Sequence, residues 1–379
     1  MAIYFNEQEK TFHLEGKDYS YIMGVAYDRF LSHLYYGKKV NMLHPSRKIV
    51  SRELGFSPSP LEFFYNRSVS LDTLPQEFPS FGYTDFRIPA IIVEQENGSR
   101  ISDFRYSSYQ ITNSKPKISN MPSIHDDGKV TTLIIDLVDE VINVVAHLIY
   151  NVYEERNVLT RHVIIENKGK EKIKLTKVMS MSFDMHDANF NFMQLHGTHC
   201  KERHIEISPL RHGITKIESR RGSSSHMMNP FFALMRKNCD ENQGEIFGFN
   251  FVYSGNYEGC VEVDQRETAR IQMGISGFDF EWELKPNEKF ETPDELSSRF
   301  NINVLLQTLF REPSEFSAEL LMESYLNAQN GDEGNQLFLR AFKIDDEYAV
   351  SIDEHIYLRK LVKKTDEPYA HVQFVGTTV

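Results

Sequence analysis

Residues 219–282 constrain the fold more than any other part of the chain. Within them, short runs rich in β-branched and aromatic residues, such as those at 246–249 and 261–263, alternate with Gly, Asn and Ser. This is the pattern of β-strands joined by tight turns. Residues 90–188 repeat it, with apolar runs about ten residues apart and no helical period between them. The sequence therefore predicts a mainly β fold, built as a large antiparallel sandwich.

The N-terminal part of the chain predicts short strands followed by irregular segments. Residues 1–40 contain alternating apolar and polar runs, whereas residues 41–66 carry three prolines and no clear periodicity. We expect residues 41–66 to form a long loop, and long loops are often functional. The prolines in residues 67–90 exclude a helix, so we expect an irregular segment packed on a sheet. Arg67 and Asp85 are its most interesting charged residues.

The composition changes at about residue 295. Residues 301–327 have a helical period, and residues 337–342 and 355–359 resemble short strands. We therefore predict a β-sandwich domain over residues 1–294 and a small α+β appendage over residues 295–379. The appendage contains no recognisable chemical motif.

Composition argues against several classes of partner. The formal net charge is −12, whereas a nucleic-acid partner needs basic surface. The first residues have neither a basic nor an apolar region of a signal peptide, and no apolar run approaches the roughly 20 residues of a membrane span. The three cysteines are widely spaced, which is typical of reduced thiols. We predict a cytoplasmic protein that binds neither nucleic acid nor membrane.

Residues 191–213 are unusually rich in histidine. One interpretation is a metal site made by His196, by His199 or Cys200, and by His204. The alternative is a loop whose imidazoles lie at the surface or form local hydrogen bonds. Zinc sites usually show tighter paired spacing of their ligands, so the pattern favours the loop. We predict no metal and no other cofactor.

Several blocks, in order along the chain, carry a resemblance to a known family. They include Ser-Leu-Asp-Thr-Leu-Pro-Gln-Glu at 70–77, Asp-Phe-Arg-Ile-Pro-Ala at 85–90 and Arg-Gly-Ser-Ser-Ser-His at 221–226. Further blocks lie at 34–39, 97–103, 201–204 and 263–265. Through these blocks, residues 1 to about 294 resemble the N-terminal β-supersandwich domain of glycoside hydrolase family 36, the bacterial α-galactosidases.

The resemblance implies hydrolysis of terminal α-galactosides, such as melibiose or raffinose, with retention of configuration. That reaction needs two carboxyl groups on either side of the glycosidic bond. In the family both are aspartates of a (β/α)8 barrel that follows the sandwich. The residues after Leu296 are far fewer than the roughly 250 of a barrel, and the family's Lys-x-Asp nucleophile motif is absent. Asp184 and Asp187 form the nearest lookalike, but relatives have no catalytic residue in this region. We therefore predict no catalytic residue and no activity of this chain alone.

One functional role carries over from the family. Its loop before the Ser-Leu-Asp-Thr run reaches the mouth of the active site and, in tetramers, closes a neighbour's site. The residues that match are Glu53, where relatives usually have aspartate, and Arg67. The resemblance implies that they contact sugar hydroxyls, and the alternative is that both are ordinary surface residues. A second hypothesis for the whole chain is a non-catalytic module that binds carbohydrate, forms a homo-oligomer or assembles with a full-length α-galactosidase.

Overall fold

The computed structural model describes residues 2–41, 58–66, 68–119, 121–126, 128–225, 227–239, 243–301, 339–344, 347–352, 357–362 and 371–376. In this part of the chain the regular elements are β-strands, apart from one short 3-10 helix, η1 (Leu61–Phe63). All strand pairings within the sheets are antiparallel. The predicted mainly β, sandwich-like fold is confirmed. The described residues hold no helix that is long and apolar enough to cross a membrane.

The first sheet is a four-stranded meander. Its strands are β1 (Ile3–Asn6), β2 (Thr11–Glu15), β3 (Tyr19–Ala26) and β4 (Phe30–Lys38). Tyr27 and Asp28, between β3 and β4, both have positive φ angles of 54° and 61°. The backbone N–H of Arg29 donates to the carbonyl oxygen of Ala26 at 3.0 Å, so Tyr27 and Asp28 are the two central residues of a tight turn. A turn with this backbone matches the right-handed twist of the strands that it joins.

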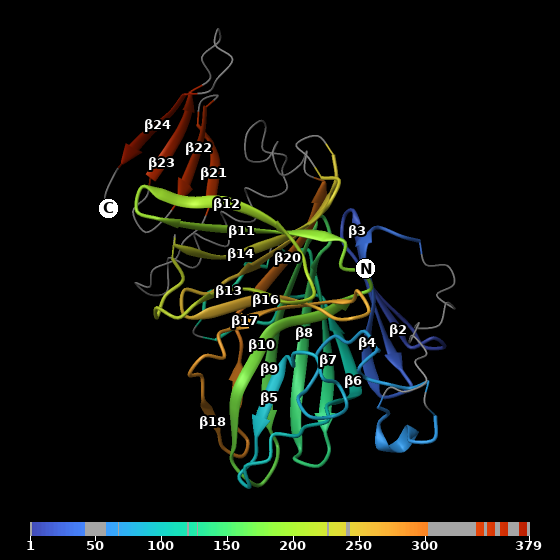
Figure 1. Ribbon diagram of the computed structural model, residues 1–379. Coiled ribbons are helices and arrows are strands. Elements are labelled where there is room, and N and C mark those ends of the chain that lie inside the picture. The colour runs from blue at the N-terminus through green and yellow to red at the C-terminus, as the bar shows by residue number, and fades with distance from the viewer. Residues whose placement is uncertain are drawn as a thin grey trace.

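The largest sheet has ten strands and forms the broad layer of the molecule (Figure 1). Its order is β12-β11-β14-β15-β20-β9-β8-β7-β6, and β19 also pairs with β9. The strands are β6 (Arg105–Thr112), β7 (Val130–Asp139), β8 (Val144–Tyr153), β9 (Val158–Asn167), β11 (Phe190–Thr198), β12 (Lys201–Pro209), β14 (Met228–Arg236), β15 (Glu245–Phe251), β19 (Lys289–Glu291) and β20 (Glu295–Asn301).

A six-stranded sheet contains most of the residues of the 219–282 stretch that do not belong to the ten-stranded sheet. Its order is β13-β16-β17-β10-β18, and β5 also pairs with β10. The strands are β5 (Ile91–Glu94), β10 (Ile173–Met185), β13 (Gly213–Ser219), β16 (Tyr257–Val263), β17 (Ala269–Ile275) and β18 (Trp282–Leu284). One half of the long strand β10 pairs with β5 and β18 and the other half with β17, so β10 lies at the centre of the sheet.

One continuous apolar core joins these three sheets. It includes Tyr21 from the four-stranded sheet, Phe183 and Val261 from the six-stranded sheet, and Leu148 and Phe249 from the ten-stranded sheet. Alternation along the strands places such side chains on the inner faces. Because buried apolar area is the dominant stabilising contribution in folding, this shared core holds the sheets together as a sandwich.

The segment that connects β4 to β5 contains no paired strand in its described residues. Past η1 it consists of turns and bends, with isolated bridges from Ser32 to Gln76 and from Ser80 to Ile91. Much of it is nevertheless buried, including Val69, Leu71 and Phe78. The predicted irregular segment packed on a sheet is confirmed.

Two stretches differ from the sequence expectation. Most of the histidine-rich residues 191–213, expected as a loop, form the β11–β12 hairpin, which ends at Pro209. Strand β12 is an edge strand, where exposed polar residues are tolerated. Strand β20 begins directly after residue 294 and pairs with both β15 and β9, so the large sheet continues past the predicted boundary. The division of the chain into two domains stays a prediction.

The C-terminal described residues form a separate four-stranded antiparallel sheet. Its strands are β21 (Leu339–Ile344), β22 (Glu347–Ile352), β23 (Tyr357–Val362) and β24 (His371–Gly376). Strands β21 and β23 overlap the two predicted strands. Of the predicted helical stretch 301–327, residues 302–327 lie outside the described residues.

Candidate functional site

The two residues predicted to contact sugar, Glu53 and Arg67, lie outside the described residues, so that prediction stays untested. The structure does describe residues 68–77, which follow Arg67 and contain the Ser-Leu-Asp-Thr run. Three groups of polar side chains hold this segment and η1 to the sandwich. The candidate site is therefore this anchored region of the chain.

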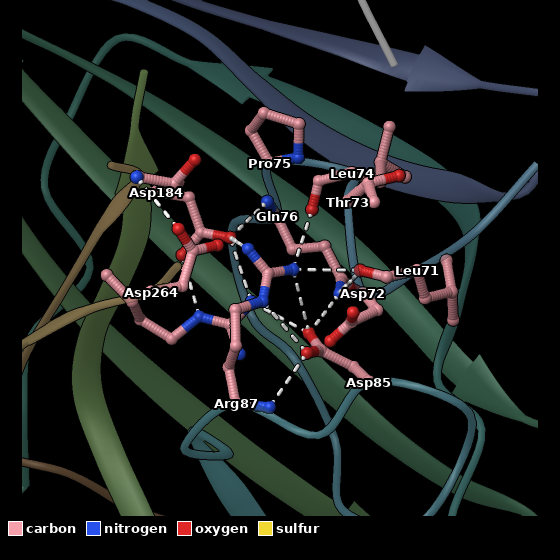
Figure 2. Close-up of polar contacts among 12 residues, drawn as sticks. Leu71, Asp72, Thr73, Leu74, Pro75, Gln76, Asp85, Arg87, Asp184 and Asp264 are labelled. Atoms are coloured by element: carbon pink, nitrogen blue, oxygen red, sulfur yellow. Dashed lines mark hydrogen bonds and ion pairs between the residues drawn. The ribbon is translucent and has the colours of Figure 1, made fainter. Parts of the chain in front are cut away.

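A buried group of four charged side chains lies against the segment, and Figure 2 labels three of them, Asp85, Arg87 and Asp184. Asp184 on β10 and Arg270 on β17 are directly opposed partners, whereas Asp85 and Arg87 come from the irregular segment. Arg270 donates through Nε to Asp184 Oδ1 at 2.7 Å and through Nη2 to Asp85 Oδ2 at 2.7 Å. Arg87 donates through Nη1 to Asp184 Oδ2 at 3.0 Å and through Nε to Asp85 Oδ1 at 2.9 Å. Two carboxylates and two guanidinium groups thus neutralise one another.

This group also fixes the backbone of the Ser-Leu-Asp-Thr segment. Arg87 Nη2 donates to the carbonyl oxygens of Leu71 and Leu74 at 2.8 and 2.9 Å. The backbone N–H of Gln76 donates to Asp184 Oδ2 at 2.9 Å (Figure 2). In a segment without strand pairing, these bonds supply partners that backbone polar groups need when they are buried. The segment is therefore held by side chains rather than by a sheet.

Asp184 is unsuited to acid–base catalysis in this setting. Burial raises the pKa of its carboxyl, but Arg270 and Arg87 outweigh burial and lower that pKa below its usual value. The carboxyl is fully buried and its oxygens accept four hydrogen bonds. It is ionised and cannot reach a glycosidic bond. Its contacts make Asp184 an anchor for the Ser-Leu-Asp-Thr segment.

A second buried group holds Glu77, at the end of the same segment. The hydroxyls of Tyr21 and Tyr150 donate to its carboxylate at 2.8 to 2.9 Å. His33 Nδ1 lies 2.7 Å from Glu77 Oε1. These partners come from β3, β8 and β4, so Glu77 ties the segment to the core between two sheets.

The same group continues to the start of β20 through Arg161 of β9. Arg161 donates to Tyr21 Oη at 3.1 Å, to Glu295 Oε2 at 3.3 Å and to Ser297 Oγ at 2.5 Å. Its guanidinium carbon also lies 4.9 Å from the centre of the Phe183 ring. Burial raises the pKa of Glu295 to about 7, even though Arg161 lies beside it.

A third group, at the surface, holds η1. Glu62 accepts from Arg29 at 2.5 Å and from Tyr83 at 2.8 Å, and Arg105 lies 3.0 Å from it. Around this anchor three apolar side chains face solvent: Leu61, Phe64 and Tyr65 are 81%, 65% and 97% exposed. Exposed apolar side chains that gather in one place commonly mark an interaction surface.

The histidine-rich hairpin does not assemble a metal site in the described residues. His196 and His204 are cross-strand partners with ring centroids 6.4 Å apart. Among the residues that the structure describes, no group of three or more His, Cys, Asp or Glu side chains could hold a metal ion. Cys200 lies exposed at the hairpin turn.

Sequence reasoning singled out Asp85 but missed its partners. The Asp-Phe-Arg block at 85–87 already contained Arg87, and a local ion pair could have been suspected there. Asp184 and Arg270 lie in different strands, 86 residues apart. The available signal was one charged residue, Asp184 or Arg270, in each of two strands that are otherwise uncharged around it.

Comparison with known proteins identifies the family. A family profile described as the glycosyl hydrolase family 36 N-terminal domain matches residues 29–285. The chain belongs to glycosyl hydrolase family 36. This family 36 chain is 45% identical over 296 residues to α-galactosidase AgaA of Geobacillus stearothermophilus. The alignment covers 78% of this chain and 40% of that enzyme.

Crystal structures of family 36 enzymes share the fold. α-Galactosidase AgaB of Geobacillus stearothermophilus aligns with a TM-score of 0.75 and 45% identity, over 79% of this chain and 41% of that chain. An AgaA variant in complex with raffinose aligns with a TM-score of 0.74 and 44% identity, over 77% and 41% of the two chains. The chain thus spans about two fifths of the length of these relatives. The matched part is their N-terminal domain, as the resemblance implied.

Proposed function

We propose that this family 36 sandwich is a non-catalytic part of α-galactosidase chemistry: it recognises terminal α-galactosides and presents a loop to a catalytic site that other residues supply. The observation that carries the proposal is the anchoring of residues 71–77 by Arg87, Asp184 and Glu77. A rigid anchor directly after a sugar-contacting loop limits the conformational freedom that binding must remove. The AgaA variant bound to raffinose supplies the ligand class.

Within that function, Glu53 and Arg67 contact sugar. A carboxylate accepts hydrogen bonds from hydroxyls and a guanidinium donates them, so the pair suits a polyhydroxylated ligand. Arg67 directly precedes the anchored segment, which supports its role at the end of the loop. Asp85 and Asp184 are unsuited to be the catalytic carboxyl pair, since both are buried and committed to Arg87 and Arg270.

The proposed function includes assembly, either as a homo-oligomer or with a complete α-galactosidase. The exposed Leu61, Phe64 and Tyr65 beside η1 support a contact surface there. The compartment that we propose is the cytoplasm, because Cys200 and Cys260 are free thiols. Sizing of the purified chain, alone and mixed with a family 36 enzyme, tests the assembly. A clean monomer that does not co-elute contradicts it.

Titration of the purified chain with raffinose tests the sugar site. We expect saturable binding, and we expect Glu53→Ala and Arg67→Ala each to weaken it about tenfold. The matched controls are Glu140→Ala and Arg221→Ala, which remove exposed residues of the same types elsewhere. If none of the four substitutions changes the affinity for raffinose, the proposed roles of Glu53 and Arg67 are contradicted.

A further inference from the structure

A groove outside the loop region has polar and aromatic walls, and most of its lining residues have no part in the proposed function. It lies where the end of β16 and the start of β13 meet the irregular segment. It has a volume of about 440 Å³, and its walls include Asp72, Phe86, His212, Glu262, Asp264 and Gln265. Small-molecule sites commonly occupy ~300–1,000 Å³. The size therefore fits a small ligand.

Asp264, which lines this groove, has one carboxylate oxygen without a hydrogen-bond partner. Its side chain is buried, with the residue 7% exposed. Oδ1 accepts from the backbone N–H groups of Arg266 and Thr268 at 2.8 and 2.9 Å, which closes the turn after β16. Oδ2 is buried without a hydrogen-bond partner. A buried acceptor without a partner is unfavourable in a folded protein, so a donor from a ligand would complete the set.

The neighbouring charges select the kind of donor. Asp72 accepts from Arg266 Nη1 at 3.1 Å, and Glu262 accepts from the backbone N–H of Ile88 at 2.6 Å. Arg87 also lines the groove, but its guanidinium is committed to Asp85 and Asp184. The groove disfavours an anion, because its walls carry carboxylates and its lining residues offer no uncommitted guanidinium. It suits a neutral ligand with several hydroxyl donors.

Phe86 adds an apolar wall. It is 74% exposed, although the residues on both sides of it, Asp85 and Arg87, are buried in the charged group. The backbone there is thus firmly held while the ring faces the groove. An exposed, positioned aromatic ring beside hydrogen-bond acceptors offers a ligand one apolar face and one polar face.

We propose that this groove is a second saccharide site, in which sugar hydroxyls donate to Asp264 Oδ2 and to Glu262 while an apolar sugar face packs on Phe86. The ligand class rests on the proposed function, but the residues do not, since none of them is Arg67 or belongs to the 41–66 loop. The groove can therefore bind sugar when Glu53 and Arg67 are absent.

The test uses the full chain carrying Glu53→Ala and Arg67→Ala, with raffinose and melibiose as probes in ligand-observed NMR and calorimetry. We expect weak, saturable binding to remain. Adding Phe86→Ala should weaken it at least fivefold, and so should Asp264→Asn, which keeps the oxygen that closes the turn and replaces the unpartnered one. Phe278→Ala, at another exposed phenylalanine, should leave it unchanged.

Two results overturn the groove site: no saturable binding in the Glu53→Ala, Arg67→Ala chain, or binding that Phe86→Ala leaves unchanged. Phe86 is exposed, so that variant decides the matter even where Asp264→Asn impairs folding. Either result leaves the loop-based function intact, because that function is measured on the chain with Glu53 and Arg67 present.

Discussion

Arg270 lies directly opposite Asp184 across β17 and β10, and its Nε and Nη2 donate to the two oxygens of that carboxylate at 2.7 and 2.8 Å. Both side chains are almost fully buried. Arg87 and Asp85 complete the group and carry its hydrogen bonds to the Ser-Leu-Asp-Thr segment. A pair in the middle of a sheet thus determines the position of an irregular segment on the sandwich.

The first prediction concerns this pair. Arg270→Ala leaves Asp184 and Asp85 buried with one guanidinium between them, and breaking a buried pair in this way costs about 3–5 kcal/mol. Urea unfolding should show a loss of that size in the free energy of unfolding. Arg100→Ala is the control, since it breaks an exposed pair with Glu94 and should cost less than about 1 kcal/mol. Similar losses in both variants contradict the special role of Arg270.

The second prediction concerns pH. Burial raises the pKa of Glu295 from 4.5 in the unfolded chain to about 7. The folded state therefore binds a proton more tightly than the unfolded state, so this contribution to stability is fully present below pH 4.5 and is lost as pH rises through 7. Glu295→Gln should remove about 3 kcal/mol of pH dependence across that window. Unfolding series at pH 4.5 to 8 measure it, and identical slopes in both proteins contradict it.

The third prediction concerns thiol reactivity. Burial raises the pKa of Cys260 to about 12, whereas Cys200 is exposed at the β11–β12 turn. Since the thiolate is the reactive form, a disulfide reagent at pH 8 should modify Cys200 in the native protein and leave Cys260 until unfolding. The Cys200→Ser variant should lose the fast phase. A fast phase that persists in this variant and disappears in Cys260→Ser contradicts the burial of Cys260.

The fourth prediction concerns packing at the centre of the six-stranded sheet. A Cβ at Gly274 would lie 2.7 Å from Met179 Cα and 2.8 Å from Ser180 N. Those are backbone atoms, so Gly274→Ala should destabilise the protein by about 1–3 kcal/mol. At Gly277 the nearest atom is 3.8 Å away, and Gly277→Ala is the matched control. Equal thermal midpoints for both variants rule out this close approach.

The sequence predicted the strand-rich sandwich because its evidence is local: apolar runs and turn residues repeat along the chain. Strand β20 was harder to predict, since Glu295, Ser297 and Ser298 are polar residues with little strand preference. They are buried because β15 and β9 pair on both sides and Arg161 binds Glu295 and Ser297. The position of such a strand depends on the strands that pair with it, and a local sequence pattern does not show those partners.

The candidate site was predictable only in part. Asp85 stood out, and the resemblance pointed to the segment around it. The role of Glu77 depends on Tyr21, Tyr150 and His33, which reach it from three strands. In sequence these residues are unremarkable members of apolar runs. They hold Glu77 because the fold buries them around its carboxylate, and the sequence alone does not show which residues the fold brings together.

Hydrolysis of an aryl α-galactoside by the purified 379-residue chain tests the central claim most directly. The account predicts no turnover above the buffer rate, because Asp85 and Asp184 are buried in ion pairs and the sandwich serves recognition. Turnover that persists through purification, and that a carboxylate substitution within this chain abolishes, contradicts the non-catalytic role.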